Sequence, residues 1–108
     1  MDDDRARITG LYDCYGALLT EKQQLYFEER YLDDLSLAEI AENEGVSKQA
    51  VRDLLIRTEK TLTRLEEQLG FAGKLGETSR SLAELTELLE RGDAAAALKA
   101  ANELKERF

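Results

Sequence analysis

The segment from residue 36 to residue 55 combines two short helical patterns with a sharp corner between them. Ser36 and Glu39 form a capping box that opens the first pattern, and Gly45 supplies the positive φ that a tight corner needs. Small and apolar side chains at helical spacing fill the wedge between the two helices: Ala41, Val46, Val51 and Leu54. The segment therefore predicts a helix-turn-helix.

The rest of the chain is also predicted to be helical. It contains no proline, and it is rich in Ala, Leu, Glu, Lys, Arg and Gln, which favour helices. Apolar spacing predicts a first helix over residues 8–19, and Thr20 with Gln23 forms a capping box for a second. Ser47 caps a fourth helix that meets no breaker before Gly70 and is about 21 residues, or roughly 30 Å, long. We therefore expect an all-α protein.

The apolar residues of the fourth predicted helix continue well beyond the helix-turn-helix. They alternate spacings of four and three, the period of a coiled-coil seam: Val51, Leu55, Thr58, Leu62, Leu65 and Leu69. Another helix must cover this seam, either from a second copy of the chain or from the C-terminal residues. We expect a homodimer.

A glycine-rich segment, residues 70–76, is predicted to be a flexible hinge. Beyond it, Ser81 and Glu84 are expected to cap a helix, and Gly92 to separate that helix from the last one. Two domains follow from this pattern: a helix-turn-helix domain over residues 1–75, and a C-terminal helical hairpin over residues 76–108 that packs on it or on a partner subunit.

The chain lacks the residues that most catalytic and metal sites need. It has no histidine and one cysteine, so neither a zinc site nor an internal disulfide is expected. Cys14 lies in an apolar helical face, which indicates a buried, inert thiol. Acidic pairs such as Asp33 and Asp34 are typical of a solvated surface, and the glycines in residues 70–76 lack the spacing of a phosphate-binding loop. No catalytic residue, metal or cofactor is predicted, and we do not expect an enzyme.

Membrane insertion and export are not expected either. No apolar run approaches the roughly 20 residues that a membrane-spanning helix needs. The acidic start, Met1 followed by three aspartates, is unlike a secretory or transit leader. The sequence therefore predicts a cytoplasmic protein with no membrane partner.

The charge of the chain is unevenly distributed. Its net charge is −8, which repels nucleic acid, yet residues 48–64 hold five basic and two acidic side chains. Within this span Arg52 and Gln49 have the chemistry to contact base edges, and their basic neighbours can hold phosphates. The predicted nucleic-acid-binding residues are Ser47, Lys48, Gln49, Arg52, Arg57 and Lys60. The alternative interpretation is an ordinary solvated helix face.

Two acidic side chains conflict with the binding interpretation. Asp53 lies within the basic span itself. Glu44 occupies a position where a helix-turn-helix usually buries an apolar side chain, so either the first helix of the motif ends early or the corner is looser than usual.

Four segments together resemble the YlxM family of small bacterial proteins. They are residues 19–24 (LTEKQQ), 31–41 (YLDDLSLAEIA), 46–51 (VSKQAV) and 57–60 (RTEK). That family has a fold resembling region 4 of sigma factors and is associated with the signal recognition particle operon. The resemblance covers residues 8–75. It implies a DNA-binding, regulatory role, with the RNA or the proteins of the signal recognition particle as candidate partners.

The sequence leaves three functions open. The first is regulatory binding of duplex DNA, with Lys48, Gln49 and Arg52 in a major groove. The second is binding of signal recognition particle RNA through phosphates and 2′-hydroxyls, because the deep A-form major groove excludes a helix. The third is a protein adaptor that uses its acidic surface and apolar helix seams, with the basic residues incidental. Competition between DNA and RNA at low salt separates them.

Overall fold

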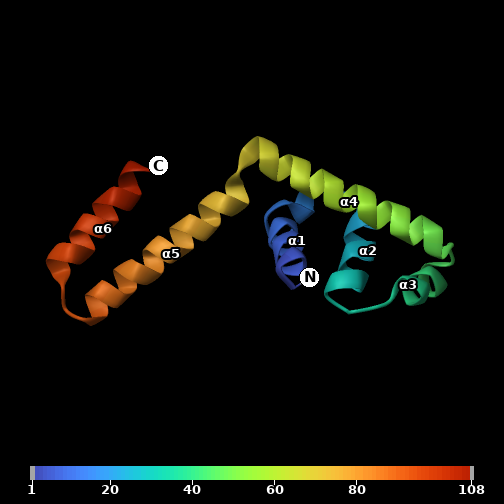
Figure 1. Cartoon of the computed structure of the whole chain (residues 1–108), viewed down its shortest axis with the longest axis horizontal. Coiled ribbons are helices and arrows are strands. Elements are labelled where there is room, and N and C mark those ends of the chain that lie inside the picture. The colour runs from blue at the N-terminus through green and yellow to red at the C-terminus, as the bar shows by residue number, and fades with distance from the viewer. Residues whose placement is uncertain (1, 108) are drawn as a thin grey trace. The chain divides into compact units, whose positions relative to one another are not determined.

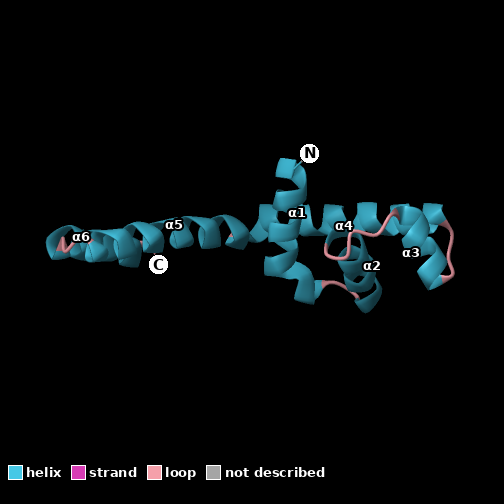
Figure 2. Cartoon of the chain, turned by 90° about the horizontal axis from the view of Figure 1, so that it is seen from below, coloured by secondary structure: helices cyan, strands magenta, loops and turns pink. Residues whose placement is uncertain are grey.

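Residues 2–107 are described by the computed structural model, and every regular element among them is a helix (Figure 1). The elements are α1 (Asp2–Tyr15), the short 3-10 helix η1 (Gly16–Leu18), α2 (Glu21–Tyr31), α3 (Leu37–Glu44), α4 (Lys48–Leu69), α5 (Phe71–Glu90) and α6 (Ala94–Glu106). Figure 2 shows that short loops join them. The predicted all-α class is confirmed.

Side-chain caps fix where the helices of the N-terminal part begin. Thr20 Oγ1 accepts a hydrogen bond from the backbone N–H of Gln23 at 3.2 Å, and Gln23 Oε1 accepts one from the Thr20 N–H at 2.9 Å. Ser36 and Glu39 make the same reciprocal pair ahead of α3, at 3.1 and 3.0 Å. These bonds satisfy N–H groups that a helix start otherwise leaves without partners. Both capping boxes predicted for the N-terminal part are confirmed.

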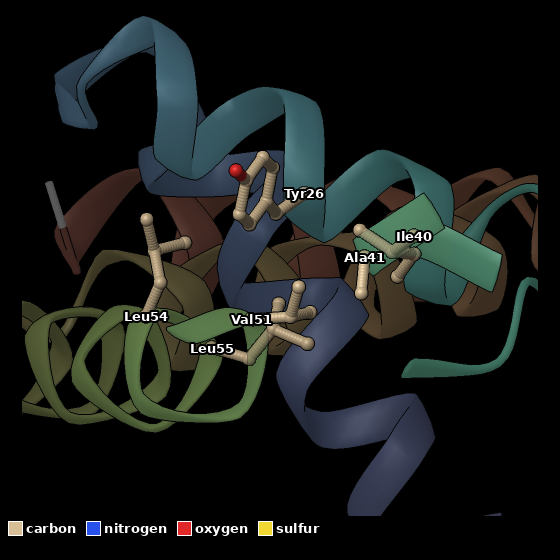
Figure 3. Close-up of a cluster of buried hydrophobic side chains, with 6 residues drawn as sticks. All are labelled: Tyr26, Ile40, Ala41, Val51, Leu54 and Leu55. Carbon is tan, nitrogen blue, oxygen red and sulfur yellow. The ribbon is translucent and has the colours of Figure 1, made fainter. Parts of the chain in front are cut away.

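The predicted helix-turn-helix is formed by α3 and α4. Gly45 adopts a left-handed conformation with φ of 67°, and the N–H of Val46 donates to the carbonyl of Ala41 at 3.1 Å. A compact apolar cluster lies behind this corner, formed by Tyr26, Ile40, Ala41, Val51, Leu54 and Leu55 (Figure 3). Ile40 and Val51 are completely buried. The corner is thus held by packing on both helices.

The helices α1 and α2 pack along the remainder of α4. Phe27 is completely buried and stacks on Tyr12, with ring centroids 4.2 Å apart. Thr58 and Leu62 of α4 are completely buried too. With Val51 and Leu55, four residues of the predicted seam are therefore buried and need no further partner. Farther along the seam, Leu65 is half-buried and Leu69 is 42% exposed.

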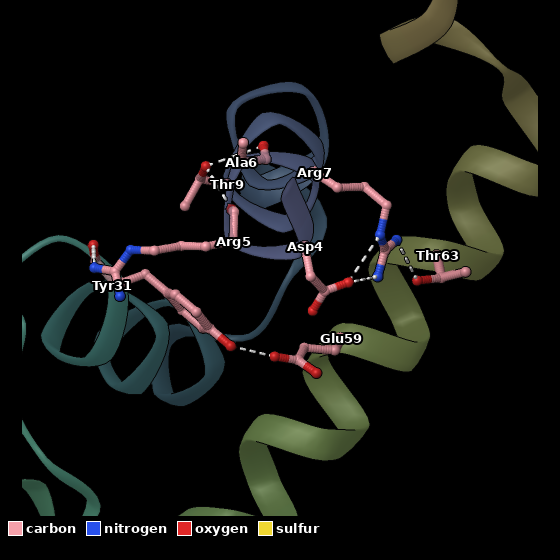
Figure 4. Close-up of polar contacts among 8 residues, drawn as sticks. All are labelled: Asp4, Arg5, Ala6, Arg7, Thr9, Tyr31, Glu59 and Thr63. Carbon is pink, nitrogen blue, oxygen red and sulfur yellow. Dashed lines mark hydrogen bonds and ion pairs between the residues drawn. The ribbon is translucent and has the colours of Figure 1, made fainter. Parts of the chain in front are cut away.

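Polar contacts tie α1, α2 and α4 together (Figure 4). The hydroxyl of Tyr31 donates to Glu59, and burial together with this carboxylate raises the pKa of Tyr31 to about 12, so it stays a neutral donor at pH 7. Arg5 donates to the carbonyl of Tyr31 at 2.7 Å, and Arg7 donates to Thr63 Oγ1 at 3.3 Å. These bonds fix α4 on its supporting helices.

The chain divides after Gly70 into two compact units, residues 1–70 and residues 71–108. In the second unit, α5 packs against α6, and Asp93 caps α6 by accepting from the N–H of Ala96 at 3.1 Å. Little of this unit is buried: no residue of α5 and only Ala97 of α6.

The predicted flexible hinge over residues 70–76 is wrong in most of its length. Gly70 ends α4 in a left-handed conformation, but α5 begins at Phe71 and continues through Gly76. An interior glycine weakens a helix by only about 1 kcal/mol, and the strong helix formers around it outweigh that cost. The predicted cap at Ser81 is wrong as well, because Ser81 lies inside α5, where its Oγ accepts from Arg107 at 3.2 Å.

Two further expectations concern single features of the chain. Cys14 was expected to be buried, but it is a half-buried free thiol, because only part of its face of α1 is covered. Among the described residues, no helix combines the length and the hydropathy that crossing a membrane requires.

Candidate nucleic-acid interface

The first turn of α4 presents polar side chains to solvent. We call Ser47, Lys48, Gln49 and Arg52 the recognition turn, and all four are exposed. Ser47 Oγ caps the helix by accepting from the N–H of Ala50 at 3.0 Å. Neither Lys48 nor Arg52 forms an ion pair with another described residue. The turn is thus rigidly mounted, and its two cations are accessible to a ligand.

Gln49 is exposed, but its side-chain amide already has a hydrogen-bond partner. Its Nε2 donates to Asp53 Oδ1 at 2.9 Å, one turn farther along the helix. Both side chains are exposed, so the bond contributes only about 0.5–1.5 kcal/mol and a competing partner can replace it. Asp53 therefore orients Gln49 and places a negative charge beside the recognition turn.

Arg57 and Lys60 do not lie with the recognition turn. On a helix, five residues correspond to roughly 140° around the axis, so Arg57 faces away from Arg52. Arg57 and Lys60 instead line an open groove of about 540 Å³ between α4 and the start of α2. We call it the basic groove, and its lining residues are Thr20, Lys22, Gln23, Leu54, Arg57, Lys60, Thr61 and Arg64. The predicted set thus falls into two separate clusters.

The basic groove contains two cations that the sequence prediction missed. Arg64 is one helical turn beyond Lys60 and was counted only in the local charge. Lys22 belongs to α2, where its Nζ lies 5.6 Å from the centre of the Tyr26 ring. No local pattern links Lys22 to α4, since only the packing of α2 on α4 brings them together. The groove has four basic side chains and no carboxylate in its lining.

A buried carboxyl group lies behind the helix-turn-helix corner. Glu29 of α2 is 7% exposed, and neither of its oxygens has a hydrogen-bond partner among the described residues. Burial, followed by the nearby carboxylate of Glu44, raises the pKa of Glu29 above its ordinary value. Glu44 is the last residue of α3 and half-buried, so the helix does not end early. The apolar position of the motif is occupied here by an interacting acidic pair.

No metal site accompanies these clusters. Among the side chains that the structure describes, those of residues 4–107, no group of three or more Asp, Glu, Cys or His is placed to hold a metal ion. The polar groups that this surface presents are cations, amides and hydroxyls, which are the groups that contact phosphates and base edges in nucleic-acid-binding proteins.

Comparison with known proteins identifies the family of this chain. Residues 2–102 match the model of the UPF0122 family, described as "Putative helix-turn-helix protein, YlxM / p13 like". The chain belongs to this family. It is 48% identical to UPF0122 protein STH1464 of Symbiobacterium thermophilum over 97 residues, which is 90% of this chain and 91% of that protein. The resemblance to YlxM proteins is confirmed, and the family description names a helix-turn-helix protein rather than a class of enzyme.

Further relatives in the family align over most of the chain. A UPF0122 protein of Desulforamulus reducens is 51% identical over 84 residues, covering 78% of this chain and 72% of its own. UPF0122 protein BH2485 of Halalkalibacterium halodurans is 45% identical over 91 residues, covering 84% of each chain. The alignments therefore extend beyond the helix-turn-helix itself.

Proposed function

We propose that this UPF0122 protein is a cytoplasmic regulator that binds duplex DNA through the recognition turn. The observation that carries the proposal is that Lys48 and Arg52 are exposed at the start of α4. The opposite side of the same part of the helix, at Val51 and Leu55, is buried in the apolar cluster and holds these side chains in place. Recognition helices of helix-turn-helix proteins insert such a turn into the major groove. Arg52 can there contact guanine through two hydrogen bonds, and Lys48 can contact a phosphate or a base.

The net charge of the protein sets the character of this binding. At −8, the body of the molecule repels DNA, so only an approach that presents the recognition turn is favourable. We infer modest affinity with a steep dependence on salt. The proposal includes a likeness of residues 1–70 to region 4 of sigma factors, which use the same kind of helix.

The test compares DNA binding of the wild type and a double variant. DNA duplexes of about 30 base pairs, three helical turns, are selected from a random pool with the full chain. Lys48→Ala with Arg52→Ala should weaken binding to the selected duplex about 10- to 1,000-fold and reduce its preference over a scrambled one. A control with the same loss of charge, Lys99→Ala with Lys105→Ala, removes two exposed cations of α6 and should bind like the wild type.

Two rival functions are outcomes of the same experiment. Tighter binding to signal recognition particle RNA than to any DNA of equal length would move the function to that particle, with which the family is associated. A protein that binds no nucleic acid even at about 50 mM salt would instead be an adaptor for signal recognition particle proteins or other partners, contacted through its acidic surface and apolar helix seams.

A further inference from the structure

The basic groove concentrates positive charge on an otherwise acidic molecule. Lys22, Arg57, Lys60 and Arg64 line one depression, and none of them forms an ion pair with another described residue. Lys60 and Arg64 also line a second depression, together with Glu59 and Glu67, and Glu59 there accepts a hydrogen bond from Tyr31. The basic groove itself contains no carboxylate. These exposed cations are therefore available to an anion, which their combined positive charge attracts.

The lining of the groove indicates which anion fits. Leu54 is the only apolar residue that lines it, and the side-chain carbons of the longer polar residues make up much of the remaining surface, with their charged ends above it. Thr61 and Gln23 add neutral hydrogen-bonding groups beside the four cations, and the groove is open rather than enclosed. Phosphate groups strung along a polymer match this combination of charge, hydrogen bonding and open shape.

The distance between the basic groove and the recognition turn indicates where such a polymer would lie. The groove residues of α4 are centred near residue 59, about 10 residues or roughly 15 Å along the axis from the centre of the recognition turn. The major groove of DNA is only about 12 Å wide. When the first turn of α4 enters the major groove end-on, the middle of the helix therefore lies at the level of the two backbones that flank the groove. The basic groove then faces one of these backbones, although Arg57 is turned roughly 140° from Arg52.

We propose that the basic groove holds consecutive backbone phosphates of the same duplex that the recognition turn contacts. This inference rests on the proposed function, and it assigns Lys22 and Arg64 to binding although both lie outside the recognition turn. The two clusters have separate roles: the recognition turn selects the sequence, and the basic groove supplies sequence-independent affinity. It also gives the middle of α4 a role in binding, because Arg57, Lys60 and Arg64 lie beyond the recognition turn on the same helix.

The test measures how the affinity for DNA depends on salt concentration, because the slope of this dependence reports the number of phosphate contacts. Binding of a labelled mixed-sequence duplex to the full chain is measured between about 20 and 150 mM salt. Lys22→Gln with Arg64→Gln should lower affinity about tenfold per lost contact near 50 mM, and should reduce the slope of log affinity against log salt by about 2 for each copy of the chain that binds the duplex. The loss should be equal for selected and scrambled duplexes. The matched control, Arg91→Gln with Lys99→Gln, removes two exposed cations of the second unit and should leave the slope unchanged.

The outcomes separate this inference from the proposed function. If Lys48→Ala with Arg52→Ala weakens binding while Lys22→Gln with Arg64→Gln behaves like the control, the groove proposal is overturned and the function stands. A wild type that binds no duplex at about 20 mM salt overturns both. Circular dichroism of each variant verifies that the helices are intact.

Discussion

At the scale of single residues, Glu29 is the side chain whose surroundings oppose its charge most strongly. It is almost completely buried, and the charged groups around it, Glu44 and Asp33, are acidic, while only Asn43 favours its ionised form. Its pKa is therefore raised from the ordinary value of 4.5. The stability that this residue contributes is fully present below that ordinary value and is lost as the pH rises through the raised pKa of the folded state.

Replacing Glu29 should therefore stabilise the protein in a pH-dependent way. Glu29→Gln has the shape of the protonated side chain and no charge to bury, so we expect the free energy of unfolding to rise by about 1–2 kcal/mol at pH 7. Near pH 4 the difference should almost vanish. Urea denaturation across this range measures it, with the exposed Glu42→Gln as the control. A large loss of stability at pH 7 would mean that the carboxylate has a favourable partner and would refute the assignment.

Single residues also show which contacts can be predicted from the sequence. The capping pairs of Thr20 and Ser36 were predictable because both partners lie within one turn of chain, where spacing fixes geometry. The pairing of Glu29 with Glu44 was not, although Glu44 stood out as an acidic residue at an apolar position. Which side chain it meets depends on how α2 packs on α3, and the spacing of residues along the chain does not determine that packing.

At the scale of elements, a comparison of two glycines distinguishes the effect of backbone conformation from the effect of side-chain packing. A Cβ added at Gly10 or at Gly45 meets no atom within 4 Å, but only Gly45 has a positive φ, 67°. Gly10→Ala should thus stabilise α1 by about 0.5–1 kcal/mol, whereas Gly45→Ala should cost about 1–2 kcal/mol at the corner. Both lie in the first unit, so urea denaturation compares them directly. Equal effects would contradict the left-handed corner.

The helices differ in how well they could be predicted. The helix-turn-helix was predictable because caps, corner glycine and apolar wedge all indicate the same structure. The start of α5 was not, since Gly70 and Gly76 look alike in sequence while only Gly70 ends a helix. The candidate site was predictable as a basic span of α4, but its division into recognition turn and basic groove depends on helical phase and on Lys22 of α2.

At the scale of the whole molecule, the second unit is too small to be stable alone. It has 38 residues, and Ala97 is its only buried hydrophobic residue among those described. Domains below about 40 residues usually require a staple or a partner. Leu75, Leu82 and Leu89 follow one another at intervals of seven on α5, and they are 58%, 48% and 58% exposed. A seven-residue repeat of exposed leucines is the pattern of a helix that pairs with another helix.

We expect the partner to be a second copy of the chain, because a two-fold axis lets the same leucine row cover itself. Leu82→Glu places a charge in the middle of that row and should convert a dimer into a monomer in sedimentation at micromolar concentration. Leu18→Glu, at a leucine 67% exposed in η1, introduces the same charge outside the row and should stay dimeric. A dimer carries two recognition turns and two basic grooves, so the Leu82→Glu monomer should also show about half the salt dependence of DNA binding. A wild type that sediments as a monomer would instead leave the leucine row to a different protein.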